Sequence, residues 1–166
     1  MNALEELRNG FRPDSISTLF VGESAPAGGT FFYCGNSTLF REMKKVFGNR
    51  DSFLEDFKRK GFYLDDLVLV PVNNLPAIER KRLRRDAIEE FANRLIAYKP
   101  KAVVIVMKAI VPVVREAMRK AGISFEPFSV SHPAFGNSTR FRNGMTEIID
   151  NLPVTSGSNT KGSHPK

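Results

Sequence analysis

Four short hydrophobic runs alternate along the chain with longer segments in which apolar residues recur at helical spacing. The runs are rich in β-branched and aromatic side chains, as buried strands usually are. They span residues 16–21, 67–72, 102–107 and 125–131. Strands that alternate with helices predict an α/β fold, a three-layer α/β/α sandwich with a central four-stranded parallel sheet.

Capping residues set the expected starts of the intervening helices. Asn36 or Ser37 caps the first helix, and Asp51 or Ser52 caps the second. Pro76 stands at the start of a long basic helix, where its missing N–H costs least. The five expected helices cover residues 37–47, 52–60, 76–98, 110–121 and 142–151.

The length of 166 residues fits one domain with a sizeable core, which we assign to residues 1–153. The polar remainder, residues 154–166, is expected to be a disordered tail. The first 14 residues lack the apolar stretch of a signal peptide, and no hydrophobic run is long enough to span a bilayer. We therefore expect a soluble monomer in the cytoplasm, associated with the nucleoid.

The net charge and the cysteine content limit which partners and which kinds of site the protein can have. The net charge of +7 favours an acidic partner such as nucleic acid, because Lys and Arg displace the counterions condensed on polyphosphates. The single cysteine, Cys34, excludes an intramolecular disulfide and a cysteine-rich metal or iron–sulfur site. We expect Cys34 to be a packed small residue.

The loop after the first strand combines a carboxylate, glycines and aromatic residues within residues 22–33. The Glu23 carboxylate can orient a water or stabilise a cation. Gly28 and Gly29 allow a phosphate or base to approach the backbone closely, and aromatic rings offer a stacking face. The alternative is a structural glycine turn with aromatic residues in the core. The loop is neither a Walker loop nor a GxGxxG motif.

The loop after the fourth strand places His132 before a proline, followed by Phe135, Arg140 and Arg142. A histidine at a strand end, with an apolar wedge and basic side chains beside it, suits a base held against a kinked DNA backbone. The alternative is a histidine that only makes structural hydrogen bonds.

Together, the two loops resemble motifs of the uracil-DNA glycosylase superfamily. The first motif reads Gly22-Glu23-Ser24-Ala25-Pro26, and the second reads His132-Pro133-Ala134. The order of strands and helices resembles that family along roughly the first 150 residues. The resemblance implies a base-excision repair enzyme that flips uracil or a related deaminated base out of DNA and hydrolyses its N-glycosidic bond.

The resemblance also implies a role for individual residues. Glu23 would stabilise the cationic sugar and position water, and His132 would donate a hydrogen bond to the departing base. Phe31 or Phe32 would stack on that base, and Phe135 would fill the space it vacates. Further base contacts would come from Gly22 and Ser24, and DNA contacts from Gly28, Gly29, Asn137, Arg140 and Arg142. No metal or cofactor is implied.

Asp65 and Asp66 lie near the position where the family reads the pyrimidine edge with an Asn. An ionised Asp only accepts hydrogen bonds, so if Asp65 or Asp66 occupies that position, specificity would shift toward another deaminated base such as hypoxanthine. The alternative is that both are exposed carboxylates that precede a strand.

The motifs depart from the family in three respects. Pro26 lies one residue further from Gly22 than in the compact form, and the Asp or Asn of several branches is missing. The iron–sulfur branch that most often uses Glu needs four cysteines.

Two other functions remain open: a catalytically silent protein that binds nucleic acid, and a small-molecule enzyme that binds nucleotides through Gly28 and Gly29. The basic run at residues 79–85 is expected to be a solvated helix face.

Overall fold

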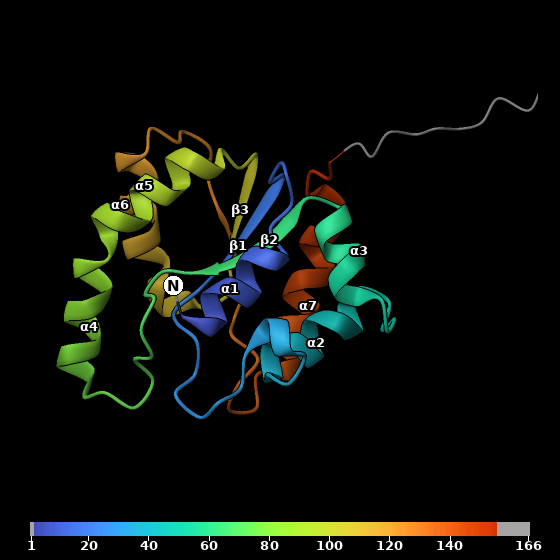
Figure 1. The fold of residues 1–166 in the computed structure, drawn as a ribbon, viewed down its shortest axis with the longest axis horizontal. Coiled ribbons are helices and arrows are strands. Elements are labelled where there is room, and N and C mark those ends of the chain that lie inside the picture. Colours follow the sequence, from blue (N-terminus) through green and yellow to red (C-terminus); the bar gives the residue numbers. More distant parts are fainter. Residues whose placement is uncertain (1, 156–166) are drawn as a thin grey trace, which may run out of the picture.

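A four-stranded sheet lies at the centre of the computed structural model, which describes residues 2–155 (Figure 1). All strands are parallel, in the order β2-β1-β3-β4, so the predicted sheet is confirmed. Thr18 of β1 pairs with Phe62 of β2 on one side and Ala102 of β3 on the other. The strands are β1 (Thr18–Gly22), β2 (Phe62–Asp66), β3 (Ala102–Ile105) and β4 (Phe128–Ser129).

Helices cover both faces of this sheet, which confirms the three-layer α/β/α architecture (Figure 1). One layer contains α2 (Thr38–Val46), α3 (Phe53–Arg59) and α7 (Ser138–Ile148), and the other contains α5 (Ile88–Tyr98) and α6 (Val111–Lys120). Two further helices, α1 (Ala3–Gly10) and α4 (Ala77–Asp86), lie outside these layers. Short 3₁₀ turns span Phe32–Cys34, Lys108–Ile110 and Ile149–Asn151.

The core is dominated by aromatic rings between the sheet and the α2–α3 layer. Phe20 of β1 is fully buried and contacts the rings of Phe57 and Phe62 at centroid distances of 5.2 and 5.5 Å. Every residue of β1 and β3 is buried, as expected for central strands covered on both faces. This packing fixes the carboxyl ends of the strands, where the loops with functional residues begin.

The predicted second strand was wrong in position. The strand is Phe62–Asp66, and residues 67–72 form the segment that follows it. Leu67 and Val68 still donate backbone hydrogen bonds to the carbonyls of Gly22 and Glu23, whereas Leu69 and Val70 are exposed. The pattern misled because two carboxylates end the true strand, and a buried arginine and a half-buried one from elsewhere in the chain compensate them.

The helices also differ from the prediction in three respects. The expected helix 76–98 is two helices, α4 and α5, which meet at Ala87. Only α5 packs its apolar face on the sheet, while α4 has no buried residue. The last helix starts at Ser138 rather than 142, and α1 was not predicted at all. The fourth strand is only two residues long, within the expected 125–131.

The chain remains attached to the domain slightly beyond residue 153. The backbone N–H of Thr155 donates to the Lys60 carbonyl at 2.7 Å. The rest of the expected tail lies outside the described residues. Within residues 2–155, no helix is both long and apolar enough to cross a membrane.

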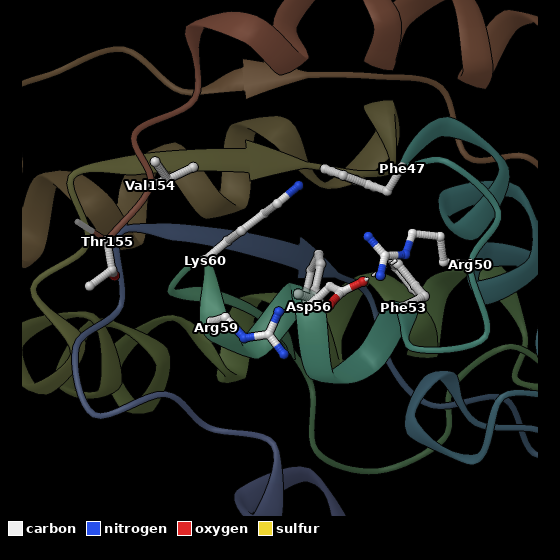
Figure 2. Close-up of a pocket in the computed structure, with 9 residues that line it drawn as sticks. Phe47, Arg50, Phe53, Asp56, Arg59, Lys60, Val154 and Thr155 are labelled. Carbon is white, nitrogen blue, oxygen red and sulfur yellow. Dashed lines mark hydrogen bonds and ion pairs between the residues drawn. The ribbon is translucent and has the colours of Figure 1, made fainter. Parts of the chain in front are cut away.

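A hollow of about 370 Å³ lies along α3, between Phe47 and Arg50 before the helix and Val154 and Thr155 near the end of the described chain (Figure 2). Its wall mixes aromatic residues with basic ones, among them Arg59 and Lys60. It contains none of the residues of the loops after β1 and β4.

Candidate functional site

The order of the strands places the candidate site at the carboxyl edge of the sheet. The direction of strand addition reverses between β1 and β3, and ligands of such sheets bind at the carboxyl edge near this reversal. Glu23 follows β1 directly, and His132 lies three residues beyond β4. Parallel strands therefore bring the two predicted catalytic residues to the same edge from opposite ends of the chain.

The Glu23 carboxylate is buried, with only 8% of the residue exposed, and two arginines hold it. Arg80 donates from Nε to both carboxylate oxygens, at 3.0 and 2.9 Å, and also through its terminal nitrogen. Arg84 donates to Oε2 from the same side. Such fork-shaped contacts hold the carboxylate in one orientation and compensate its negative charge.

Helix α4 supplies both arginines. Residues four apart lie on one helix face, so Arg80 and Arg84 point toward Glu23 together. Arg82 and Arg85 lie elsewhere on the helix and are exposed. The expectation of a wholly solvated basic face was therefore wrong for Arg80 and Arg84. Their spacing of four did not distinguish them in the sequence, because Lys81 and Arg85 have the same spacing and are exposed.

His132 has a defined protonation state. Its Nδ1 accepts a hydrogen bond from the Ala134 N–H at 3.2 Å, so the neutral ring carries its proton on Nε2. Burial lowers the pKa of His132, and nearby Arg80 lowers it further, while Glu23 opposes the shift. The imidazole is therefore neutral at pH 7, with an N–H free to donate, and Glu23 and Arg80 share its electrostatic environment.

Backbone contacts hold the loop after β1 in place. The Ser24 hydroxyl accepts from the Val72 N–H at 3.2 Å, and Asn73 accepts from the Ala27 N–H at 2.9 Å. Ser24, predicted to contact a base, thus positions the loop in the free protein. Gly28 and Gly29 are exposed at its tip, with open space around both, and Gly29 has a φ of +83° that favours glycine.

Asp65 and Asp66 form a buried charge cluster at the end of β2. They are 1% and 5% exposed, so the alternative of exposed carboxylates that precede a strand was wrong. Arg8 pairs with Asp66 at 2.9 Å, and Arg94 pairs with Asp65 at 2.6 Å. Burial raises the pKa of Asp66, although Arg8 opposes that shift.

Gly22 makes room for this cluster. A Cβ atom there would lie 2.5 Å from the Asp66 side chain. The predicted base-binding residues Gly22, Asp65 and Asp66 are thus brought together. Arginines are already ion-paired with both carboxylates.

The predicted stacking aromatics are not open to solvent. Phe31 and Phe32 are 2% and 3% exposed, and Phe32 packs among the core rings. The guanidinium of Arg8 covers the face of Phe31, with its central carbon 5.0 Å from the ring centroid. The prediction of an exposed stacking face was wrong for the free protein, because the unforeseen helix α1 brings Arg8 onto this ring.

Phe135 is the exposed aromatic of the site. The residue is fully exposed at the tip of the loop after His132, and its φ of +56° is a left-handed conformation that an aromatic residue rarely adopts. Asn137 donates from Nδ2 to the Ala134 carbonyl at 3.0 Å and closes this loop. The loop therefore presents Phe135 outward, as a wedge residue requires.

The other predicted DNA contacts divide into two kinds. Arg140 is exposed and lines an open hollow of about 520 Å³ on α7, together with Asn137. Arg142 is instead paired with Glu42 at 2.5 Å and fastens α7 to α2. Cys34 is exposed, so its expected packing was wrong.

The described part of the chain, residues 2–155, has no cluster of three or more His, Cys, Asp or Glu residues that could hold a metal ion. The arrangement offers an ion-paired carboxylate, a neutral imidazole with an N–H to donate, two arginines and an exposed aromatic ring along one edge of the sheet. No protein-family model matches this chain, and no curated protein matches it either.

Proposed function

We propose that this protein is a DNA glycosylase that removes uracil or a related deaminated base from DNA by hydrolysis. The observation that carries the proposal is the convergence of Glu23 and His132 at one edge of the sheet, although 109 positions separate them in sequence. Glycosidic cleavage needs an anion near the sugar and a hydrogen-bond donor to the departing base. These are the chemical groups that the two residues provide.

In this reaction water adds to C1′ of the sugar as the bond from C1′ to the base nitrogen breaks. Glu23 stabilises the positive charge that develops on the sugar and accepts a proton from the water. His132 donates from Nε2 to the base oxygen on which negative charge develops. A neutral imidazole suits this task, and its pKa is lowered by burial and by Arg80.

Exposed apolar side chains support DNA as the substrate. Phe135 at the loop tip, Ile78 on α4, and Val70 after β2 are 102%, 84% and 52% exposed. Phe135 lies on the loop that contains His132, and Ile78 lies on the helix that contains Arg80 and Arg84. Val70 lies on the segment whose Val68 N–H donates to the Glu23 carbonyl. Exposed apolar groups beside basic ones suit unstacked bases and their phosphates.

A second function, nucleic-acid binding without cleavage, is favoured by a different observation. In the free protein, arginines neutralise Glu23, and Arg8 covers Phe31. A base can stack on this face of Phe31 only if the Arg8 side chain moves away from it. If Arg8 never moves, the site would bind DNA and leave the base attached.

Base release distinguishes the two functions. Labelled oligonucleotides with uracil or hypoxanthine, single-stranded or mispaired, would be incubated with the protein and then treated with alkali. We expect strand breaks at one of these bases, and a loss of about 10²- to 10⁴-fold in rate for Glu23→Gln and for His132→Ala.

The matched controls are Glu55→Gln on the exposed surface of α3 and His164→Ala, the other histidine of the chain. Both should cleave at the rate of the unaltered protein. Binding without breaks on every substrate would reject the glycosylase and leave the second function.

A further inference from the structure

The paired arginines around Glu23 present a chemical problem for the proposed reaction. One carboxylate and two guanidinium groups leave an excess of one positive charge beside the place where the sugar becomes cationic. A positive site would oppose that charge rather than stabilise it. Something in the substrate must therefore neutralise the arginines before Glu23 can act.

Phosphate groups have the chemistry to do so. Guanidinium forks bind phosphate as they bind carboxylate, through parallel N–H donors. The side chains of Arg80 and Arg84 are 28% and 13% exposed, so a ligand can approach them without unfolding the site. The open glycines Gly28 and Gly29 lie on the same loop as Glu23 and leave room for a strand to pass.

Helix α4 is free to follow such a ligand. It has no buried residue, and beyond its two ion pairs to Glu23 it packs on the core through the partly buried Leu83. A helix held mainly by charge can change partners at small cost when a second anion arrives. Five of its ten residues are basic, with Glu79 and Asp86 as its only acids, so it attracts a polyanion.

We propose that two phosphates of the substrate strand, one on each side of the target nucleotide, replace the Glu23 carboxylate on Arg80 and Arg84. The proposal rests on the proposed DNA substrate and deepens it. Two phosphates change the excess charge around the sugar from one positive to one negative, and Glu23 becomes free to face the sugar only then. The substrate is consequently a nucleotide inside a strand, rather than a free nucleoside or a mononucleotide.

Oligonucleotide binding tests this proposal without any need for base release. The probe is a fluorescent single-stranded 15-mer with a tetrahydrofuran abasic site at its centre, and Kd is measured by anisotropy over a range of NaCl concentrations. A second probe carries uncharged methylphosphonates at the two positions that flank the abasic site. The unaltered protein should bind the second probe more weakly and with a smaller salt dependence.

The decisive variants lie on one helix. Arg80→Gln/Arg84→Gln should reduce the slope of log Kd against log salt by about 1.4, the value for two phosphate contacts on a single strand. It should also bind the two probes alike. The matched control, Arg82→Gln/Arg85→Gln, removes the same charge from exposed positions and should still distinguish the probes.

Removal of the carboxylate gives the opposite effect. Glu23→Gln should bind the charged probe more tightly, by about tenfold, because the carboxylate no longer competes for the arginines. The gain should vanish in Glu23→Gln/Arg80→Gln/Arg84→Gln. This triple variant leaves no unpaired charge behind, so it also serves if the double arginine variant fails to fold.

Two results would overturn the proposal: an unchanged or weaker affinity of Glu23→Gln for the charged probe, or arginine variants that still distinguish the probes. The two proposals fail separately. Tighter binding by Glu23→Gln, together with no base released by the unaltered protein, would reject the glycosylase and keep the phosphate site. Base release by the unaltered protein, together with arginine variants that still distinguish the two probes, would reject the phosphate site and keep the glycosylase.

Discussion

Arg8 and Asp66 form a buried ion pair of 2.9 Å that joins the N-terminal helix to the end of β2. Arg8 also approaches Asp65, and its guanidinium covers the ring of Phe31. The two carboxylates raise the pKa of Arg8 against the opposing effect of its burial. The relationship means that α1 places a guanidinium over one face of Phe31 and ties that ring to the end of β2.

Replacement of Arg8 by an apolar residue should destabilise the protein strongly. Arg8→Leu leaves Asp65 and Asp66 buried with one cation fewer, which we expect to lower the free energy of unfolding by about 3–5 kcal/mol. Urea unfolding followed by circular dichroism measures this change. The exposed Arg85→Gln should alter stability by less than about 0.5 kcal/mol. A loss for Arg8→Leu as small as that of the control would contradict a compensating role for Arg8.

The protonation of His132 should respond to its two charged neighbours in opposite directions. Burial and Arg80 lower its pKa below the ordinary value of 6.5, while Glu23 raises it. Arg80→Gln should therefore raise the midpoint of the His132 imidazole in an NMR titration, and Glu23→Gln should lower it. His164→Gln assigns the signals, because the chain has only two histidines.

The same shift gives stability a pH dependence. The unfolded chain binds a proton at His132 near pH 6.5, and the folded protein binds it only at lower pH. Stability should therefore fall as the pH drops from 6.5 through the folded pKa, and this fall should be smaller in His132→Gln. Equal dependence of stability on pH in the two proteins, or a titration midpoint of 6.5 for His132 in the folded protein, would exclude a buried imidazole.

Phe135 should show opposite effects on stability and on DNA binding. Phe135→Gly relieves the left-handed φ of +56° and should stabilise the free protein by about 1 kcal/mol, while it weakens binding to a duplex with a mispaired uracil. Phe135→Ala removes the ring but keeps the strain, so it should weaken binding without the gain in stability. Thermal unfolding and anisotropy measure the two effects. Equal binding by all three proteins would exclude Phe135 as the wedge.

Cys34 should react readily in the folded protein. Its side chain is exposed, so a thiol reagent such as dithionitrobenzoate should modify one thiol per chain without denaturant. Cys34→Ser should give no reaction. A thiol that reacts only after addition of guanidinium chloride would show that the residue is buried in solution.

The fold was largely predictable because its signals are local. The strands at 16–21 and 102–107 are continuous apolar runs, and the alternation of strands and helices dictates a parallel sheet. The second strand was misplaced because Asp65 and Asp66 look like solvent-exposed residues. Their burial depends on Arg8 and Arg94, which lie far away in sequence. No pattern within a short window contains that information.

The site residues on loops that directly follow strands were predictable, whereas those supplied by helices were not. Glu23 and His132 occupy the expected edge of the sheet because parallel strands end together. Arg80 and Arg8 come from helices whose position is set by tertiary packing. The basic run at residues 79–85 indicated a positively charged helix, but not which of its side chains would point toward Glu23. Nothing in the first ten residues indicated that Arg8 would cover Phe31.

The central place of β1 gives the protein an order of assembly during synthesis. Glu23 leaves the ribosome early, with the first strand, and its two arginines follow on α4. His132 is synthesised only after β4, the edge strand that comes last in the sequence. A nascent chain can therefore pair the Glu23 carboxylate with its arginines first, and Glu23 and His132 come to the same edge only once β4 has docked on β3.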